Sequence, residues 1–184
     1  MLVLHFDYAS PASAVALLRL QAIADRGASV AFSGIDVLGL DVGVPVTLDQ
    51  LEELATWAPR ARELGMELQR PRVRPPTLGA HLLGSLAQAH DLGAAWRTAV
   101  LEAYWARRLD IGREDVLVEL AEGIGLPGTQ ASEELADRSR RAAMRRAMTA
   151  ERQRGVGGVP VLEFQGTFVP ADLADEDLQR LAAL

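Results

Sequence analysis

The chain has 184 residues, of which 49% are hydrophobic, and its formal net charge at pH 7 is −6. This length suits one domain, or one domain with a subdomain inserted in it, and the composition is that of a globular protein. The negative charge argues against a nucleic-acid-binding protein, because such proteins carry a basic surface. The chain contains no cysteine, which excludes disulfides, thiolate metal ligands and cysteine nucleophiles.

The first residues show no secretion or membrane signal. Residues 1–7 lack the basic start and long apolar run of a signal peptide, and no apolar stretch reaches the roughly 18 residues that span a bilayer. Lack of cysteine also removes the usual reason to assign a small protein to an oxidising compartment. We therefore expect a cytoplasmic protein that does not bind membranes.

The first 46 residues predict a strand, a helix and a second strand. The apolar run 2–6 is typical of a buried strand. Ser10 followed by Pro11 predicts a helix start, because serine is a good N-cap and proline fits the first turn. We expect this helix to cover residues 12–26 and the second strand to cover residues 30–37.

The middle of the chain predicts mainly helix. Residues 48–68 have a helical pattern that we expect Pro59 to interrupt, and the proline-rich segment 70–76 predicts a linker. Four further helices are expected up to the glycine-rich segment, at residues 77–92, 94–109, 113–122 and 132–153.

The last 30 residues return to strands. The segment 155–160 (GVGGVP) leads into an expected strand at 161–164, which pairs with 167–169 in a hairpin, and residues 172–184 predict a closing helix. A strand–helix–strand start and a strand–strand–helix end, separated by helices, predict a small α/β core that carries a helical insertion.

Three features of the sequence resemble the DsbA-like thioredoxin superfamily. Residues 6–13 (FDYASPAS) resemble the S-P-x-S opening of kappa-class glutathione transferases and 2-hydroxychromene-2-carboxylate isomerases. Residues 155–160 resemble the superfamily's G-V-x-G-V-P motif, whose proline is cis and faces the active site. Residues 77–82 and 110–126 resemble the helical cap of the FrnE-like branch.

The resemblance implies an α/β fold of the thioredoxin-like class with a large all-helical insertion. It implies a discontinuous core formed by residues 1–46 and 154–184, and an inserted helical cap formed by residues 47–153. Redox members of the superfamily place C-x-x-C where this chain has Ser10-Pro11-Ala12-Ser13. Since a serine hydroxyl cannot exchange disulfides, we expect no thiol–disulfide oxidoreductase activity.

Ser10 has two interpretations, which are compatible. As an N-cap it contributes about 1 kcal/mol to stability. The resemblance implies that it also donates a hydrogen bond to the thiolate of a bound glutathione, with Ser13 as the less favoured candidate for this role. The positive end of the helix dipole stabilises a thiolate at this position.

The segment Gly158-Val159-Pro160 is the second candidate binding element. A cis Val159–Pro160 bond exposes the backbone N–H and C=O of the preceding residue, and an extended peptide such as glutathione can pair with them. The alternative is an ordinary trans proline at the start of a strand.

Asp172 lies where glutathione-using relatives have G-x-D-R after the last hairpin, so the resemblance implies that it binds the γ-glutamyl amine. Here the motif reads Pro170-Ala171-Asp172-Leu173, without the glycine and the arginine. The alternative is that Asp172 is the N-cap of the final helix.

Other polar and aromatic residues carry weaker signals. We expect His5 in the core, and His81 and His90 are not spaced as metal ligands, so no metal site is predicted. Arg72 and Arg74, flanked by prolines, are candidates to hold a carboxylate at the lip of a cleft, or are solvated loop residues.

The large aromatic residues of the helical block are expected in its core, although two of them are alternatives for lining a cleft. They are Trp57, Trp96, Tyr104 and Trp105, the last two being the cleft candidates.

Two classes of function therefore stay open. The first is an isomerase or transferase that uses glutathione or another low-molecular-weight thiol as co-substrate on a small electrophilic or aromatic substrate. The second is a non-catalytic DsbA-like protein that binds peptides or ligands. In either case we expect a small-molecule partner and no metal, nucleic acid or membrane, and the sequence leaves a homodimer open.

Overall fold

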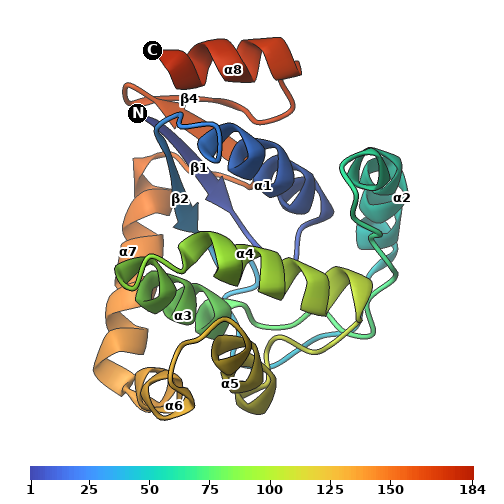
Figure 1. The fold of residues 1–184 in the computed structure, drawn as a ribbon. Helices are drawn as coiled ribbons and strands as arrows, with labels where there is room; N and C mark the ends of the chain where they lie inside the picture. The colour runs from blue at the N-terminus through green and yellow to red at the C-terminus, as the bar shows by residue number, and fades with distance from the viewer.

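The computed structural model describes all 184 residues (Figure 1). The chain begins as strand–helix–strand, continues through a block of helices, and ends as strand–strand–helix. The strands are β1 (Leu2–Phe6), β2 (Val30–Gly34), β3 (Val161–Phe164) and β4 (Thr167–Pro170). The α-helices are α1 (Pro11–Ala24), α2 (Leu48–Glu63), α3 (Leu78–Ala89), α4 (Gly93–Leu101), α5 (Glu114–Gly123), α6 (Gly128–Ala136), α7 (Arg138–Arg154) and α8 (Asp175–Ala183). A short π-helix, η1 (Glu102–Ala106), continues α4.

The four strands form one mixed sheet in the order β2-β1-β3-β4. β1 pairs in parallel with β2 and antiparallel with β3, and β3 pairs antiparallel with β4. Leu4 lies opposite both Phe32 and Leu162, so apolar side chains of three strands meet on one face. Because β1 is central and covered on both faces, it needs the continuous apolar run that its sequence shows.

Helices cover both faces of the sheet. α1 lies on the face that carries Leu4, and it is itself enclosed by α2, α4 and α8, which explains why its apolar residues are not restricted to one side (Figure 1). α7 runs along the other face, where Met148 and Val156 pack with Ile35 and Phe168. Helices α3, α5 and α6 lie together beyond the carboxyl end of β1 (Figure 1).

The thioredoxin-like fold with a helical insertion is present as expected. All four strands lie within residues 1–46 and 154–184, and helices α2 to α7 lie between them. The exact division at residues 46/47 and 153/154 stays a prediction. One hydrophobic cluster of 34 buried residues joins the sheet, α1 and the helical block.

Several predicted element boundaries were wrong. Pro59 does not interrupt α2, which runs through it and ends at Glu63. The helix expected at 132–153 is two helices, because Asp137 leaves helical geometry and its carboxylate accepts two backbone N–H groups at the start of α7. β2 ends at Gly34 because the chain turns toward Asp7, whose carboxylate accepts the N–H of Val37.

No helix in the structure combines the length and the apolar character that a membrane span requires.

Candidate functional site

A groove of about 120 Å³ lies along α1, between α2 and the end of the β3–β4 hairpin. Its lining residues come from four separate parts of the chain: Ala12, Val15, Ala16, Arg19, Trp57, Pro160, Pro170, Ala171 and Asp172. The sheet order explains this meeting, since β3 is the neighbour of β1 and therefore brings Pro160 beside the helix that follows β1. Two of the sequence-predicted site residues, Pro160 and Asp172, thus share one groove with the first turn of α1.

Ser10 is the N-cap of α1, as the sequence predicts. It has extended backbone geometry, and its Oγ accepts the N–H of Ser13 at 3.2 Å, with Pro11 in the first turn. The N–H of Ala12 makes no hydrogen bond within the chain, so one backbone donor stays available at the positive end of the helix. The start of α1 can therefore accept an anionic or hydrogen-bond-accepting group.

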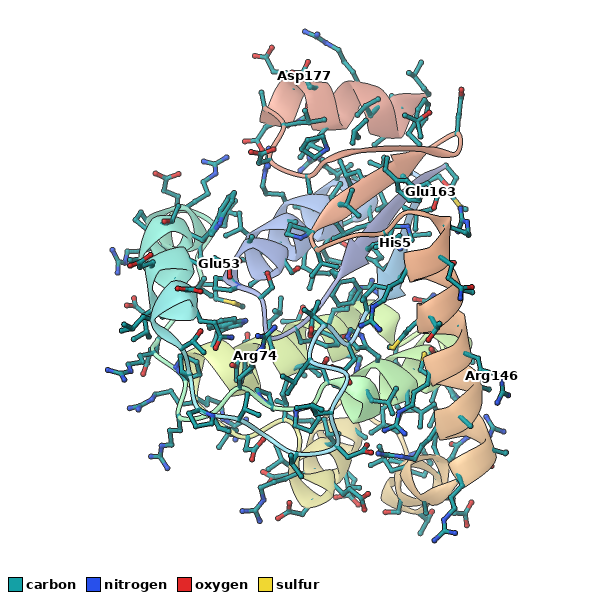
Figure 2. The ribbon with its side chains drawn as sticks, turned by 180° about the vertical axis from the view of Figure 1, so that it is seen from behind. His5, Glu53, Arg74, Arg146, Glu163 and Asp177 are labelled. Carbon is teal, nitrogen blue, oxygen red and sulfur yellow. The ribbon has the colours of Figure 1, made fainter.

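The Ser10 hydroxyl also contacts α2. Its Oγ donates to Oε1 of Glu53 at 3.3 Å, and Figure 2 shows Glu53 on the side of α2 that faces α1. A carboxylate therefore lies at the end of α1 where redox members of the superfamily hold a thiolate. A thiolate bound at the start of α1 would therefore lie close to the Glu53 carboxylate.

The other serine of the motif is placed differently. Ser13 is 0% exposed, and its Oγ accepts the backbone N–H of Asp7 at 3.3 Å. Its hydroxyl lies beneath the start of α1 rather than in the groove.

The Val159–Pro160 peptide bond is cis, as the resemblance implied. The backbone N–H and C=O of Val159 make no hydrogen bond within the chain, although β3 begins only two residues later. Gly155 has a φ of +117° and ends α7, which turns the chain toward this segment, and Gly158 is exposed. The structure therefore leaves the backbone N–H and C=O of Val159 free to pair with a ligand.

Asp172 is exposed, lies at the groove and makes no hydrogen bond or ion pair. The alternative that it caps the last helix was wrong, because the N-cap of α8 is Ala174 and no side chain caps it. Buried Arg19 instead fixes this loop: its guanidinium donates to the carbonyls of Ala171 and Leu173, and Nε lies 2.7 Å from Oδ1 of Asp175. The loop that carries Asp172 is therefore held in place while its carboxylate stays free.

A sequence profile of the DSBA-like thioredoxin domain matches residues 1–182. The chain belongs to this family.

Known proteins agree with the assignment. The chain is 30% identical over 115 residues to the uncharacterized protein YwbO of Bacillus subtilis, an alignment that covers 61% of this chain and 58% of YwbO. Among solved structures, a probable DsbA oxidoreductase, SCO1869 from Streptomyces coelicolor, superposes with a TM-score of 0.80 at 23% identity, covering 98% of this chain and 88% of that one. A 2-hydroxychromene-2-carboxylate isomerase gives 0.77 at 20% identity, covering 99% and 92%. At these identities the structural likeness shows the fold.

Two residues that line this family member's groove, and the carboxylate that contacts Ser10, were not found from the sequence. Glu53 and Trp57 lie four residues apart on α2, on the helix face that packs toward α1, and Arg19 lies on α1 itself. The capping box formed by Thr47 and Gln50 marks the start of α2, but no sequence pattern shows against which element this helix packs.

A buried carboxylate organises the turn between β1 and α1. Asp7 accepts the N–H of Ala9 at 3.1 Å through Oδ1 and that of Val37 at 2.8 Å through Oδ2, and Nε2 of His81 lies 3.8 Å from Oδ1. Burial alone would raise the pKa of Asp7, but His81 and the two backbone donors hold it below its ordinary value. Asp7 is therefore a charged anchor directly beneath the Ser10 turn.

The helical block contains most of the large aromatic side chains in its core, as expected. Trp96, Tyr104 and Trp105 are buried, and Nε1 of Trp105 donates to the carbonyl of Tyr8 at 3.0 Å. Trp57 differs, because it is half-buried and forms a wall of the groove.

The two proline-flanked arginines do not line the groove. Arg72 is exposed and Arg74 is half-buried, with its backbone paired to Val44.

His5 is buried, as predicted, and points toward Glu163 on β3 (Figure 2). Its Nε2 lies 3.1 Å from Oε2 of Glu163. Hydrogen bonding by His5, together with Arg154, lowers the pKa of Glu163. Glu151 lies close enough for the three side chains to surround a metal ion, but Arg154 pairs with both carboxylates and supplies the positive charge there.

Proposed function

We propose that the groove binds glutathione or another low-molecular-weight thiol, and that the protein uses this thiol to isomerise or modify a small electrophilic or aromatic substrate. The observation that carries the proposal is that the first turn of α1, the cis Pro160 and the free carboxylate of Asp172 line one groove, next in the chain to the Ser10 cap and to the unpaired backbone of Val159. A thiol-containing peptide presents a group for each of these three elements. Bound there, it would supply a nucleophilic sulfur for addition to an electrophilic carbon.

The residues of the groove fit the parts of such a peptide. The Ser10 hydroxyl and the free N–H of Ala12 are donors for a sulfur anion at the positive end of α1. Val159 offers one backbone donor and one acceptor for strand-like pairing, and Asp172 offers a negative charge for an ammonium group. The groove, of about 120 Å³, holds only part of such a peptide, and the rest would lie outside it along the backbone of Val159.

Glu53 distinguishes this site from a simple thiolate pocket. Its carboxylate accepts the hydrogen bond that the Ser10 hydroxyl donates, so a bound thiolate must take that hydrogen bond from Glu53. The Glu53 carboxylate therefore competes with a bound thiolate for the Ser10 hydroxyl.

Disulfide exchange is not part of this proposal. The reaction passes through a mixed disulfide with a protein thiol, and the chain has no cysteine to form one.

Titration calorimetry with reduced glutathione tests the thiol proposal, with S-methylglutathione as the matched ligand that cannot ionise at sulfur. We expect glutathione to bind more tightly than its methylated form. Ser10→Ala should weaken glutathione binding and raise the pKa of the bound thiol, because a hydrogen bond to a charged group contributes about 1.5–3 kcal/mol. The thiolate's ultraviolet absorbance, followed against pH, reports that pKa.

Ser10→Asp separates binding from capping. Aspartate caps a helix well, so the melting temperature should survive, whereas its charge should repel a thiolate and weaken binding more than alanine does. Glu53→Gln removes the neighbouring charge and should strengthen thiolate binding. If neither Ser10 variant changes glutathione affinity while Ser10→Ala still lowers the melting temperature, Ser10 is a cap only and the thiol proposal is wrong.

A non-catalytic peptide-binding protein is the second candidate, favoured by the unpaired backbone of Val159. It requires no ionised sulfur. In that case S-methylglutathione binds as tightly as glutathione, and the Ser10 and Glu53 variants leave both affinities unchanged.

A further inference from the structure

A second cavity, of about 230 Å³, lies at the other edge of the sheet, between β2, α3 and α4. It shares no lining residue with the groove. Four aromatic residues border it, Phe6, Tyr8, Phe32 and Trp96; Phe32 is half-buried, whereas the other three rings and the imidazole of His81, stacked on Tyr8, are almost wholly covered and lie beneath the cavity. The volume corresponds to about eight water molecules, which is small for a drug-sized ligand but sufficient for one ring with a small substituent.

Arg97 of α4 lines this cavity and forms no ion pair. Its Nε and one Nη donate to Oε1 of Gln21 at 2.9 and 2.6 Å, and its Cζ lies 3.9 Å from the centre of the Phe32 ring. Its remaining Nη donates to no protein atom. Burial lowers the pKa of Arg97 below its ordinary value, as expected for a cation that has lost water without gaining a carboxylate partner.

Comparison with Arg19 shows that Arg97 lacks a carboxylate partner. Arg19, also withdrawn from water, has Asp175 at 2.7 Å and two backbone carbonyls. Arg97 contacts the neutral amide of Gln21 and an aromatic face, and the nearest carboxylate that acts on it, Asp25, is bound to Gln21 and forms no ion pair with it. A half-buried guanidinium with unused donors at a cavity wall is suited to a planar anion, which it can bind with parallel hydrogen bonds.

Further polar groups meet at the same wall. A Cβ placed on Gly93 would lie 3.3 Å from Nη1 of Arg97 and 2.2 Å from Oε1 of Gln88, so both side chains approach the space that this glycine leaves. The hydroxyl of Ser85 also lines the cavity and contacts only the carbonyl of His81, one turn earlier in α3, at 3.4 Å. The cavity thus has a polar wall facing aromatic ones.

We propose that this cavity is a binding site for a small planar organic anion of the monocyclic aromatic carboxylate class. The carboxylate pairs with the free Nη of Arg97, with Gln88 and Ser85 as further hydrogen-bonding partners. The ring lies beside Phe32, over the aromatic layer that Phe6, Tyr8 and Trp96 form beneath the cavity. The aromatic walls disfavour inorganic phosphate, which offers no apolar surface to bury. This site is independent of the thiol site proposed above.

Titration calorimetry of the full chain with benzoate tests the proposal, and benzamide is the matched neutral ligand. We expect saturable benzoate binding and at least about tenfold weaker binding of benzamide, because the hydrogen bond to a charged group is lost. Inorganic phosphate should bind more weakly than benzoate. Failure of benzoate to saturate the protein, or equal affinity for benzamide, overturns the proposal.

Two variants locate the ligand. Arg97→Gln should reduce benzoate affinity at least about tenfold. Ser85→Phe should abolish binding by filling the cavity, and because Ser85 is exposed and contacts only its own helix, this variant stays folded even if Arg97→Gln does not.

Arg146→Gln, on the outer side of α7 (Figure 2), is the matched loss of an exposed arginine and should bind benzoate as the wild type does. Ser10→Ala should also leave benzoate affinity unchanged, whatever it does to thiols. Wild-type affinity in both Arg97→Gln and Ser85→Phe places the ligand elsewhere and refutes the site.

Discussion

At the level of single residues, two buried charged side chains, Asp7 and Arg19, hold the backbone next to the groove in place. Asp7 holds two backbone N–H groups beneath the Ser10 turn, and Arg19 holds the carbonyls of the loop that carries Asp172. Both are buried, and both have partners that compensate the charge. Because the turn and the loop border the groove from opposite sides, these two residues fix its geometry without entering a reaction.

Replacement of Asp7 by asparagine should lower the free energy of unfolding by about 1–3 kcal/mol. An amide has one oxygen, so its NH₂ group faces the N–H of either Ala9 or Val37 and one donor is left unsatisfied. Urea unfolding at pH 7 measures the change, and Asp172→Asn is the control, since Asp172 makes no hydrogen bond and should differ from wild type by less than about 0.5 kcal/mol.

The Asp7 contribution should also depend on pH. Its folded-state pKa is lowered, so its stabilisation is complete above the unfolded pKa of about 3.9 and is lost as pH falls through the folded pKa. The difference between wild type and Asp7→Asn should therefore narrow below about pH 4. An unchanged difference at pH 3 contradicts the assignment of a charged Asp7.

At the scale of elements, α2 matters because it forms one wall of the groove. It carries Glu53 and Trp57 on the side that faces α1, and Arg60 joins it to Asp175, which also binds Arg19. The direction in which α2 begins is set by the capping box of Thr47 and Gln50.

Thr47→Ala should lower stability by about 1 kcal/mol, because Thr47 Oγ1 accepts the N–H of Gln50 and alanine leaves that donor unpaired. Thr47→Ser keeps the acceptor and is the control. Thermal melts followed by circular dichroism compare the three proteins. Equal loss in both variants would mean that the threonine methyl group, rather than the cap, is responsible.

At the scale of the whole molecule, the sheet and the helical insertion share one hydrophobic core. The cluster of 34 buried residues includes Leu162 of β3 as well as Trp96 and Trp105 of the helical block. Because the core is shared, the sheet and the helical insertion cannot separate without exposing buried apolar surface. The inserted helices are therefore a structural part of the fold rather than an independent domain.

Leu162→Ala tests whether the sheet and the helical insertion unfold together. It removes most of a fully buried side chain from the sheet and should lower the free energy of unfolding by about 2–5 kcal/mol. All three tryptophans lie in the helical insertion, so their fluorescence reports its unfolding, together with the contacts of Trp105 with Tyr8 and of Trp57 with the groove. The fluorescence-detected urea midpoint should shift as far as the midpoint from circular dichroism. A fluorescence midpoint that stays at the wild-type value would show that the two parts unfold separately.

Local sequence patterns were sufficient to predict the order of the elements, the capping of α1 by Ser10 and the family. These depend on local patterns: an apolar run for β1, a serine–proline pair, and a glycine–proline motif before β3. The missing cysteines excluded disulfide exchange without any structure. The predicted elements were wrong where local rules compete, as at Pro59, which α2 tolerates, and at Asp137, which interrupts one helix to cap the next.

The contacts between distant side chains could not be predicted from local patterns, because they depend on how the elements pack. Glu53 reaches Ser10 across 43 positions, Arg19 reaches the β4–α8 loop across more than 150, and Arg97 is left without an ion pair beside a cavity. Sequence patterns specify which face of an element is apolar, but they do not specify the neighbour against which that face packs. Hydrogen bonds and charges act over a few ångströms, so the properties of a site depend on the packing that brings distant segments together.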